Sequence, residues 1–175
     1  SRPDYLFYDI ELMYHGVAEA EKCSRCQEAF KASGKESWED FLTDLGKQIM
    51  MDMDAAVRKG CEAIDLPHPL VGSYNVHPGN RIYDGIFEFT KVYPEPLNLS
   101  QPSIYVRGDA AKVHEVISGN YKAMKTKDII PWLTAGTYGE FAPWKMEPMV
   151  LEVLLNGGKG LTYYLWQDFD GPMDY

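Results

Sequence analysis

Short apolar segments alternate along this chain with longer segments in which apolar residues recur at helical spacing. Runs rich in aromatic and β-branched residues predict five strands, because such residues pack well on a pleated backbone. The predicted strands cover residues 5–10, 70–75, 103–107, 129–134 and 160–166. Each pair of successive strands is separated by enough residues for a helical connection, which favours a parallel arrangement.

The longest helical pattern follows Ser37. Apolar residues recur every three or four positions from Trp38 to Val57, and Gly60 is the expected stop. Ser37 followed by Asp40 resembles a capping box.

Residues 83–92 fit either a short helix or a strand. Three further helices are expected, over residues 17–32, from Asp109 onward, and from Pro143 or Pro148 to the terminator Asn156-Gly157-Gly158.

Strands that alternate with helices indicate an α/β fold with a parallel sheet. An open nucleotide-binding sheet would carry a glycine-rich turn after its first strand, but residues 9–13 read Asp-Ile-Glu-Leu-Met. Polar and aromatic residues instead follow every predicted strand, as they do at the carboxyl ends of (β/α)8 or TIM-barrel strands. Five units are too few to close such a barrel. We therefore expect a single domain over residues 1–175 that forms part of a TIM barrel, approximately units 4 to 8.

The expected partners follow from the open sheet edges and from the charge. A partial barrel leaves two edges unpaired, so we expect self-association or contacts with the missing part of the parent chain. The net charge of −9 argues against nucleic acid and against anionic membrane surfaces as partners. No apolar run approaches the roughly 20 residues that span a bilayer. The compartment stays open, and an extracellular or periplasmic parent protein is compatible with the sequence.

The cysteines and histidines lead us to expect neither a metal site nor a cofactor. Cys23 and Cys26 have the C-x-x-C spacing, but Cys61 is the one other cysteine, so no second pair completes a structural zinc site. We favour small apolar side chains on the buried face of a helix, and a disulfide or a metal-ligand pair is the alternative. The four histidines share no spacing typical of metal ligands, and no Gly-x-Ser-x-Gly motif indicates a serine hydrolase.

The first predicted strand ends in two acids, Asp9 and Glu11. Side chains alternate along a strand, so these two carboxyl groups are expected on the same side. Two close carboxylates resist ionising together, so one of them keeps its proton to higher pH. A protonated carboxyl group at the end of a buried strand suits general acid catalysis. The alternative is a strand that ends in two solvated acids.

Residues 4–11 resemble the end of the D-x-x-D-x-D-x-E signature of the family 18 glycoside hydrolases, the chitinases and their relatives. Aligned on Glu11, Asp9 and Asp4 match acids of the signature, whereas Phe7 replaces the middle Asp and Tyr5 the usual Gly. The resemblance implies a barrel in which Glu11 is the proton donor. It also implies that Asp9 orients the acetamido group of the substrate.

The last predicted strand is also similar to the last barrel strand of that clan, where Trp166 would form the floor of the sugar pocket. A second glycosidase pattern involves Glu140, which follows the predicted strand 129–134. Many retaining glycosidases use one Glu after strand four and another near the end of strand seven, so Glu11 and Glu140 at ~5 Å would make a covalent retaining mechanism available. If Asp9 and Glu11 alone are central, the neighbouring-group mechanism of the chitinase clan is favoured. The alternative role of Glu140 is that of a loop acid at a helix amino terminus.

These patterns predict a glycoside hydrolase-like barrel that cleaves glycosidic bonds in a carbohydrate, with Glu11 as general acid. The alternative is a non-catalytic carbohydrate-binding or structural barrel, which the loss of the acid at Phe7 favours. Further residues at or after strand ends are expected to stack on sugar faces or to bond sugar hydroxyls, and ordinary barrel packing is the alternative for each. They are Tyr74, Asn75, Tyr105, Arg107, Trp132, Trp166 and Asp168.

Overall fold

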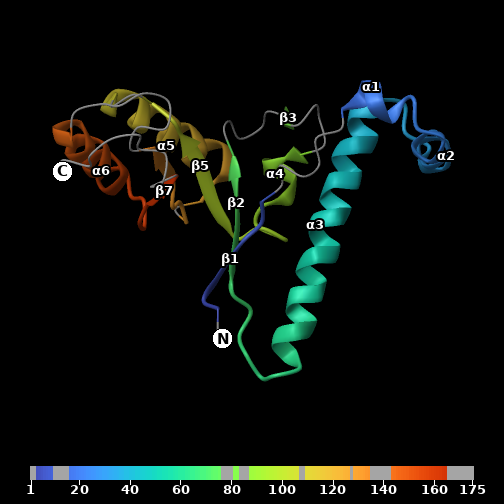
Figure 1. The fold of residues 1–175 in the computed structure, drawn as a ribbon, viewed down its shortest axis with the longest axis horizontal. Coiled ribbons are helices and arrows are strands. Elements are labelled where there is room, and N and C mark those ends of the chain that lie inside the picture. The colour runs from blue at the N-terminus through green and yellow to red at the C-terminus, as the bar shows by residue number, and fades with distance from the viewer. Residues whose placement is uncertain are drawn as a thin grey trace, which may run out of the picture. The chain divides into compact units, whose positions relative to one another are not determined.

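The structure is a computed structural model that describes residues 3–9, 16–75, 81–82, 87–106, 109–126, 128–134 and 143–164 (Figure 1). The chain divides into two compact units. Unit 1 comprises residues 1–71 and 79–98, and unit 2 comprises residues 72–78 and 99–175. The two units are described separately below, and the single domain expected from the sequence stays a prediction.

Five strands form one parallel sheet, and helices alternate with them along the chain. The strands are β1 (Tyr5–Phe7), β2 (Leu70–Asn75), β5 (Leu99–Ile104), β6 (Trp132–Thr134) and β7 (Thr162–Tyr164). Their order in the sheet is β1-β2-β5-β6-β7, and the registers from β2 to β7 are parallel throughout. The α/β fold class with parallel units of a partial barrel is therefore confirmed.

The third strand of the sheet lies earlier in the sequence than the apolar pattern predicts. The prediction was residues 103–107, whereas β5 runs from Leu99 to Ile104 and all six of its residues are buried. Pro102 indicates a loop in the sequence, since proline cannot donate to a strand ladder. In the structure Pro102 pairs in register with Asn75 of β2, so the sheet accommodates a residue without an N–H group.

The described ends of the neighbouring strands differ from the prediction by a few residues. Ile129 makes an isolated parallel bridge with Ser100, and the regular ladder of β6 begins only at Trp132. In β7 the described ladder covers Thr162–Tyr164, in the middle of the predicted run 160–166. The register of β6 against β5 and β7 fixes which residues of these three strands pair with one another.

Unit 1 contains helices α1 (Val17–Ala20), α2 (Ser24–Ser33), α3 (Trp38–Glu62) and α4 (Phe89–Val92). The predicted helix over residues 17–32 is interrupted, because Cys23 has an extended backbone and begins α2 as its N-cap. Ser37 caps α3 as predicted, and its hydroxyl accepts a hydrogen bond from the Asp40 N–H at 3.1 Å. Gly60 does not stop α3, since a single glycine costs only ~1 kcal/mol in a helix.

The ambiguous segment 83–92 contains both kinds of structure within the described residues. Strand β4 (Phe87–Glu88) pairs antiparallel with β3 (Arg81–Ile82), and α4 follows directly. Phe89 and Val92 on α4 are buried. The two apolar side chains therefore contribute to the core of unit 1.

The core of unit 2 lies between the sheet and two helices, α5 (Ala110–Met124) and α6 (Met146–Leu155), seen beside β5 and β7 in Figure 1. Asp109 caps α5 as predicted and accepts hydrogen bonds from the first-turn amides of Ala111 and Lys112. A short 3-10 helix, η2 (Pro143–Lys145), precedes α6. The buried core residues are Ile104, Val113, Ile117, Ile129, Leu133, Met149 and Val153.

Replacing Ile117 with alanine tests the importance of this core. The side chain is fully buried among residues of both helices and the sheet, so Ile117→Ala should lower the free energy of unfolding by roughly 2–5 kcal/mol. The matched control is Leu155→Ala on α6, whose side chain is 79% exposed and should change stability by less than about 0.5 kcal/mol. Equal melting temperatures for the two variants would contradict the assigned core.

Candidate functional site

The structure describes only some of the predicted site residues. Asp9, Tyr105 and Trp132 are described with their side chains, and Tyr74 and Asn75 are described as backbone positions in β2. The other predicted residues lie outside the described part of the chain, and their roles stay predictions. They are Glu11, Arg107, Glu140, Trp166 and Asp168.

Asp9 is exposed two residues after β1 ends at Phe7. Its neighbour Tyr8 is buried, as strand-like alternation requires, and its hydroxyl has no hydrogen-bond partner among the described residues. Burial raises the pKa of Tyr8, and the negative charge of Asp54 raises it further. Asp9 therefore points to the exposed side of this segment, and Tyr8 points to its buried side.

Three strands of unit 2 place polar and aromatic residues side by side. Ser103 on β5 pairs in register with Trp132 on β6, which in turn pairs with Thr162 on β7. Two residues further along, Thr134 pairs with Tyr164. Since paired residues of parallel strands share a sheet face, Ser103 and Trp132 lie next to each other.

The other face of these strands packs in the apolar core. Ile104 and Leu133, the next residues along β5 and β6, are paired and packed in the core with α5 and α6. Alternation therefore directs Ser103 and Trp132 away from those helices. We call this the polar face, defined by Gln101, Ser103, Trp132 and Thr134. It combines an amide, two hydroxyl groups and an indole.

Gln101 anchors the start of the polar face and is completely buried. Its side chain crosses over Gly72 of β2, so closely that a β-carbon on Gly72 would overlap the amide oxygen. Glycine is therefore required at position 72 for the amide to lie where it does. The sequence pattern did not indicate Gln101, because the predicted strand begins only at residue 103.

The two serine hydroxyl groups of β5 differ in their hydrogen-bond partners. Ser100 faces α5, where its hydroxyl lies 3.4 Å from Oδ1 of Asn120. Ser103 is only 7% exposed, and its hydroxyl has no hydrogen-bond partner among the described residues. A buried hydroxyl without a partner costs about 1–3 kcal/mol. Ser103 is thus a buried donor that a bound hydroxyl compound could satisfy.

A pocket of about 300 Å³ opens at the end of β5. Ser103 and Tyr105 line it from the strand side, and Lys112 and Glu115 line it from α5. The predicted binding residue Tyr105 is half-buried there. The pocket thus lies between the end of β5 and α5 and includes the predicted residue Tyr105, whereas Trp132, the first residue of β6, does not line it.

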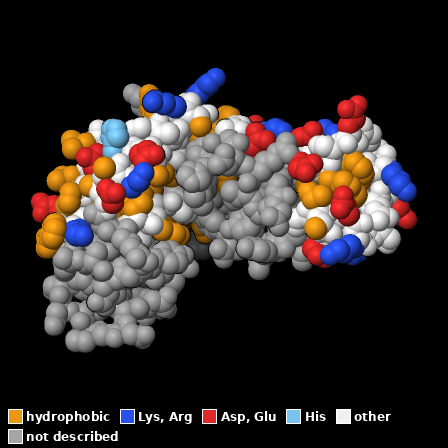
Figure 2. Space-filling model, turned by 90° about the horizontal axis from the view of Figure 1, so that it is seen from above, with side chains coloured by type: hydrophobic (Ala, Val, Ile, Leu, Met, Phe, Trp, Pro, Cys, Tyr) orange, Lys and Arg blue, Asp and Glu red, His pale blue; other side chains and the backbone are white. Residues whose placement is uncertain are grey.

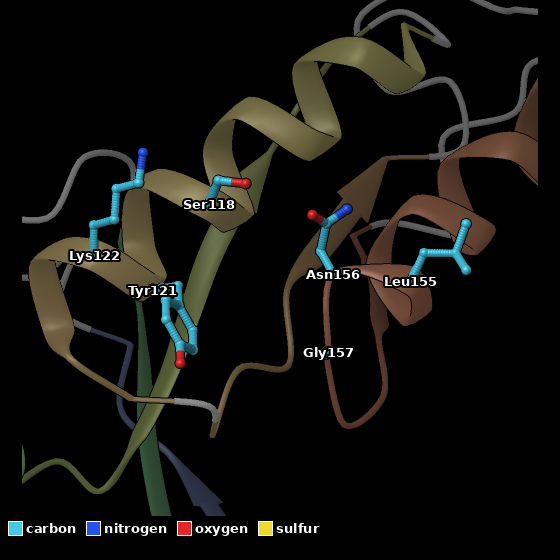
Figure 3. Close-up of a pocket in the computed structure, with 6 residues that line it drawn as sticks. All are labelled: Ser118, Tyr121, Lys122, Leu155, Asn156 and Gly157. Carbon is cyan, nitrogen blue, oxygen red and sulfur yellow. The ribbon is translucent and has the colours of Figure 1, made fainter.

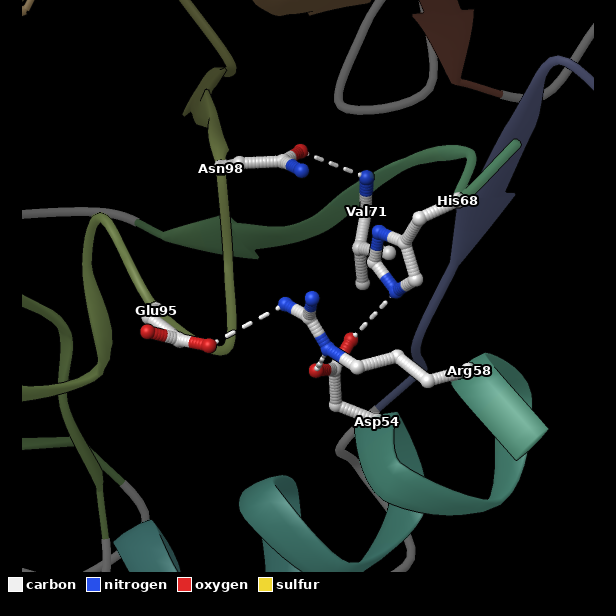
Figure 4. Close-up of polar contacts among 6 residues, drawn as sticks. All are labelled: Asp54, Arg58, His68, Val71, Glu95 and Asn98. Atoms are coloured by element: carbon white, nitrogen blue, oxygen red, sulfur yellow. Dashed lines mark hydrogen bonds and ion pairs between the residues drawn. The ribbon is translucent and has the colours of Figure 1, made fainter. Parts of the chain in front are cut away.

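A second polar cluster lies in unit 1 (Figure 4). Asp54 of α3 is only 3% exposed, and its two carboxylate oxygens accept from Nε of Arg58 at 2.6 Å and contact Nε2 of His68 at 2.8 Å. Arg58 also contacts Glu95 at 3.1 Å. The hydrogen bond to Asp54 raises the pKa of Arg58, and Glu95 adds to the effect. The cluster ties α3 to the segments before β2 and β5.

Its position indicates that the cluster is structural. Beside it, the Val71 N–H donates to the Asn98 side chain at 2.7 Å and the Asn98 N–H donates to the Val71 carbonyl oxygen at 3.0 Å (Figure 4). The contact of Asp54 with His68 and the paired hydrogen bonds of Val71 and Asn98 therefore fix the chain around the start of β2. The sequence signal for this cluster is the i,i+4 spacing of Asp54 and Arg58 on a helix.

A larger hollow of about 460 Å³ lies between the carboxyl-terminal ends of α5 and α6 (Figure 3). Tyr121 and Lys122 border it on one side and Leu155 and Asn156 on the other. The Asn156 amide already donates to Glu152, at 2.7 Å to the backbone oxygen. Tyr121, Leu154 and Leu155 at these helix ends are exposed hydrophobic side chains, and Figure 2 shows hydrophobic, acidic and basic side chains interspersed on unit 2. Among the predicted site residues that the structure describes, none lines this hollow.

The interpretation of Cys23 and Cys26 as buried apolar side chains is wrong. Helix α2 has no buried residue, both cysteines are half-exposed, and all three cysteines of the chain are free thiols. Among the described residues no group of three or more His, Cys, Asp and Glu side chains could hold a metal ion. No described helix is both long enough and apolar enough to span a membrane.

The Asp54 cluster can be tested by mutation. Asp54→Ala leaves Arg58 and His68 without their shared acceptor, so the free energy of unfolding should fall by roughly 2–4 kcal/mol. Asp52→Ala is the matched control, because Asp52 is an exposed acid on the same helix and its loss should cost less than about 0.5 kcal/mol. Chemical denaturation measures both values, and a loss no larger for Asp54 than for Asp52 would refute the structural role.

Comparisons of this chain with protein-family models, with curated proteins and with solved structures gave no match. The resemblance to family 18 glycoside hydrolases is therefore carried by the motif residues alone. The site described here is defined by geometry: a partial barrel with a polar face next to an apolar core.

Proposed function

We propose that this chain is a carbohydrate-active barrel and that it hydrolyses glycosidic bonds with Glu11 as general acid. The observation that carries the proposal is the polar face of β5 and β6, above all the pairing of Ser103 with Trp132. The motif around Asp9 and Glu11 supplies the chemistry. The polar face supplies the binding groups.

The polar face suits a neutral polyhydroxylated ligand. Its described groups are an amide, hydroxyls and an indole, and none of them carries a charge. An indole offers a flat apolar surface with one donor, and hydroxyl and amide groups both donate and accept. Sugar rings present flat C–H surfaces rimmed by hydroxyl groups, which are the counterparts of the partly exposed Trp132 indole and of the Ser103 hydroxyl, whereas Gln101 and Thr134 are buried and shape the face. A charged metabolite would find no counter-ion among these four residues.

The reaction requires a protonated acid at the glycosidic oxygen. Glu11 would donate its proton to the leaving group, and Asp9 beside it would remain ionised and help to orient the substrate. With Asp9 as the main partner, an acetamido group on the sugar acts as the nucleophile. With Glu140 at about 5 Å from Glu11, a covalent glycosyl-enzyme forms instead.

The second candidate is a barrel that binds carbohydrate without cleaving it. The replacement of a signature acid by Phe7 favours this candidate. Both candidates require the polar face, and only the hydrolase requires the proton of Glu11. The two can therefore be separated by a single substitution.

We expect Glu11→Gln to lower the turnover of chromogenic glycosides by roughly 10²–10⁴-fold, because glutamine keeps the shape but cannot transfer a proton. Oligosaccharide binding should survive. Glu147→Gln, a change of an exposed acid on α6, is the matched control and should retain full turnover. Wild-type turnover in Glu11→Gln would remove Glu11 from the mechanism, and binding without turnover in the unaltered chain would establish the second candidate.

Trp132→Ala tests the polar face independently of the chemistry. Loss of the indole should weaken oligosaccharide binding by roughly 5- to 150-fold, equivalent to about 1–3 kcal/mol of aromatic contact. Trp132→Phe keeps a ring and should recover most of the affinity. Trp144→Ala is the control, because this tryptophan is 70% exposed on η2. If Trp144→Ala weakens binding as much as Trp132→Ala, the polar face is not the binding surface.

A further inference from the structure

Two cysteines face each other at the start of α2. Cys23 is the N-cap of the helix, and Cys26 is its third residue. Both are half-exposed free thiols. The side chains of an N-cap residue and of the third helical residue lie on the same side of the first turn. Because the β-carbons of a disulfide lie about 3.5–4.5 Å apart, bond formation requires the first turn of α2 to tighten.

The surroundings of Cys23 favour its thiolate form. The backbone N–H of Cys26 lowers the pKa of the Cys23 thiol, and the Cys26 thiol and Arg25 lower it further. Because the Cys26 thiol donates toward Cys23, its own pKa is raised. The first turn of α2 contains no acidic residue that would oppose a negative charge at this helix end. Cys23 is thus the nucleophilic member of the pair, and Cys26 is the second thiol.

Helix α2 is held in place by aromatic packing. Phe30 stacks on Trp38 of α3 with ring centroids 4.2 Å apart, and both rings contact Phe41 edge-on at 5.6 and 5.8 Å. An ion pair between Lys35 and Asp44 adds a further tie between the α2–α3 loop and α3. The pair of cysteines therefore lies on a fixed helix and not on a free chain end.

Cys61 cannot replace either member of the pair. It lies 23 residues beyond Trp38 on α3, which corresponds to about 35 Å along the helix axis, whereas α2 packs at the other end, beside Trp38. Metal binding is also disfavoured, because two thiolates supply only half of a tetrahedral zinc site and no described third ligand lies nearby.

We propose that Cys23 and Cys26 form a thiol–disulfide exchange site whose substrate is a low-molecular-weight disulfide. The Cys23 thiolate attacks one sulfur of the small disulfide RSSR, a mixed disulfide forms, and RS⁻ leaves. The Cys26 thiol loses its proton to solvent and attacks the Cys23 sulfur, and a second RS⁻ leaves. Two protein thiols are oxidised to one disulfide, and one RSSR is reduced to two RSH. This activity is independent of the proposed glycoside chemistry.

The probe is oxidised glutathione, applied to the fully reduced chain and followed by mass spectrometry. The unaltered chain should lose two hydrogen atoms and release two molecules of glutathione per chain. Trypsin cleaves after Lys22, Arg25 and Lys31, so the reduced pair separates into two peptides and the oxidised pair stays linked. Linked peptides 23–25 and 26–31 are the expected product.

Three single variants distinguish the roles of the three cysteines in the proposed reaction. Cys26→Ser should stop at a mixed disulfide on Cys23, formed roughly tenfold faster than any adduct on Cys61. Cys23→Ser should react slowly at Cys26, and Cys61→Ser should still form the disulfide. Circular dichroism checks that α2 and α3 persist in each variant. A Cys26→Ser variant whose Cys23 reacts no faster than Cys61, or a reduced chain that yields no linked peptides, would overturn the proposal.

Discussion

The arrangement of unit 2 depends on the burial of one face of its sheet beneath α5 and α6. Ile104 and Leu133 pack there with side chains of both helices, and this burial is the main favourable contribution to the fold of the unit. Because strand side chains alternate, fixing these two residues in the core also fixes the direction of Ser103 and Trp132. The packing of the apolar core therefore also places the residues of the polar face side by side, and no further interaction is needed to position them.

Unit 1 is stabilised by different means. The long helix α3 is joined to α2 by the packing of Phe30, Trp38 and Phe41 at its amino-terminal end. Further along, Asp54 links α3 to His68 before β2. A buried carboxylate is tolerated there because both of its oxygens have partners, one of them a guanidinium group. The exposed start of α2 is consequently presented on a helix that is fixed at its other end, which is the setting that a reactive pair of cysteines requires.

The sequence predicts local features of this structure well and tertiary features less well. The caps at Ser37 and Asp109 depend on side-chain chemistry within one turn, so the pattern alone identifies them. The start of β5 was missed because Pro102 and the polar residues around it do not look like a strand, yet pairing on both sides buries them all.

The burial of Cys26 was predicted wrongly, because helical spacing does not indicate which face of a helix packs against a neighbouring element. Tyr105 and Trp132 were predicted from their places in or after apolar runs, and their binding role stays a prediction. Gln101 carried no local signal, because its position depends on the close approach of Gly72.

We propose that the polar face of β5 and β6 binds carbohydrate. A crystal structure of the chain with a bound oligosaccharide tests it most directly. We expect a sugar ring stacked on Trp132 and a sugar hydroxyl group within hydrogen-bond distance of Ser103. A sugar ordered instead in the hollow between α5 and α6, against Tyr121 and Leu155, would contradict the account.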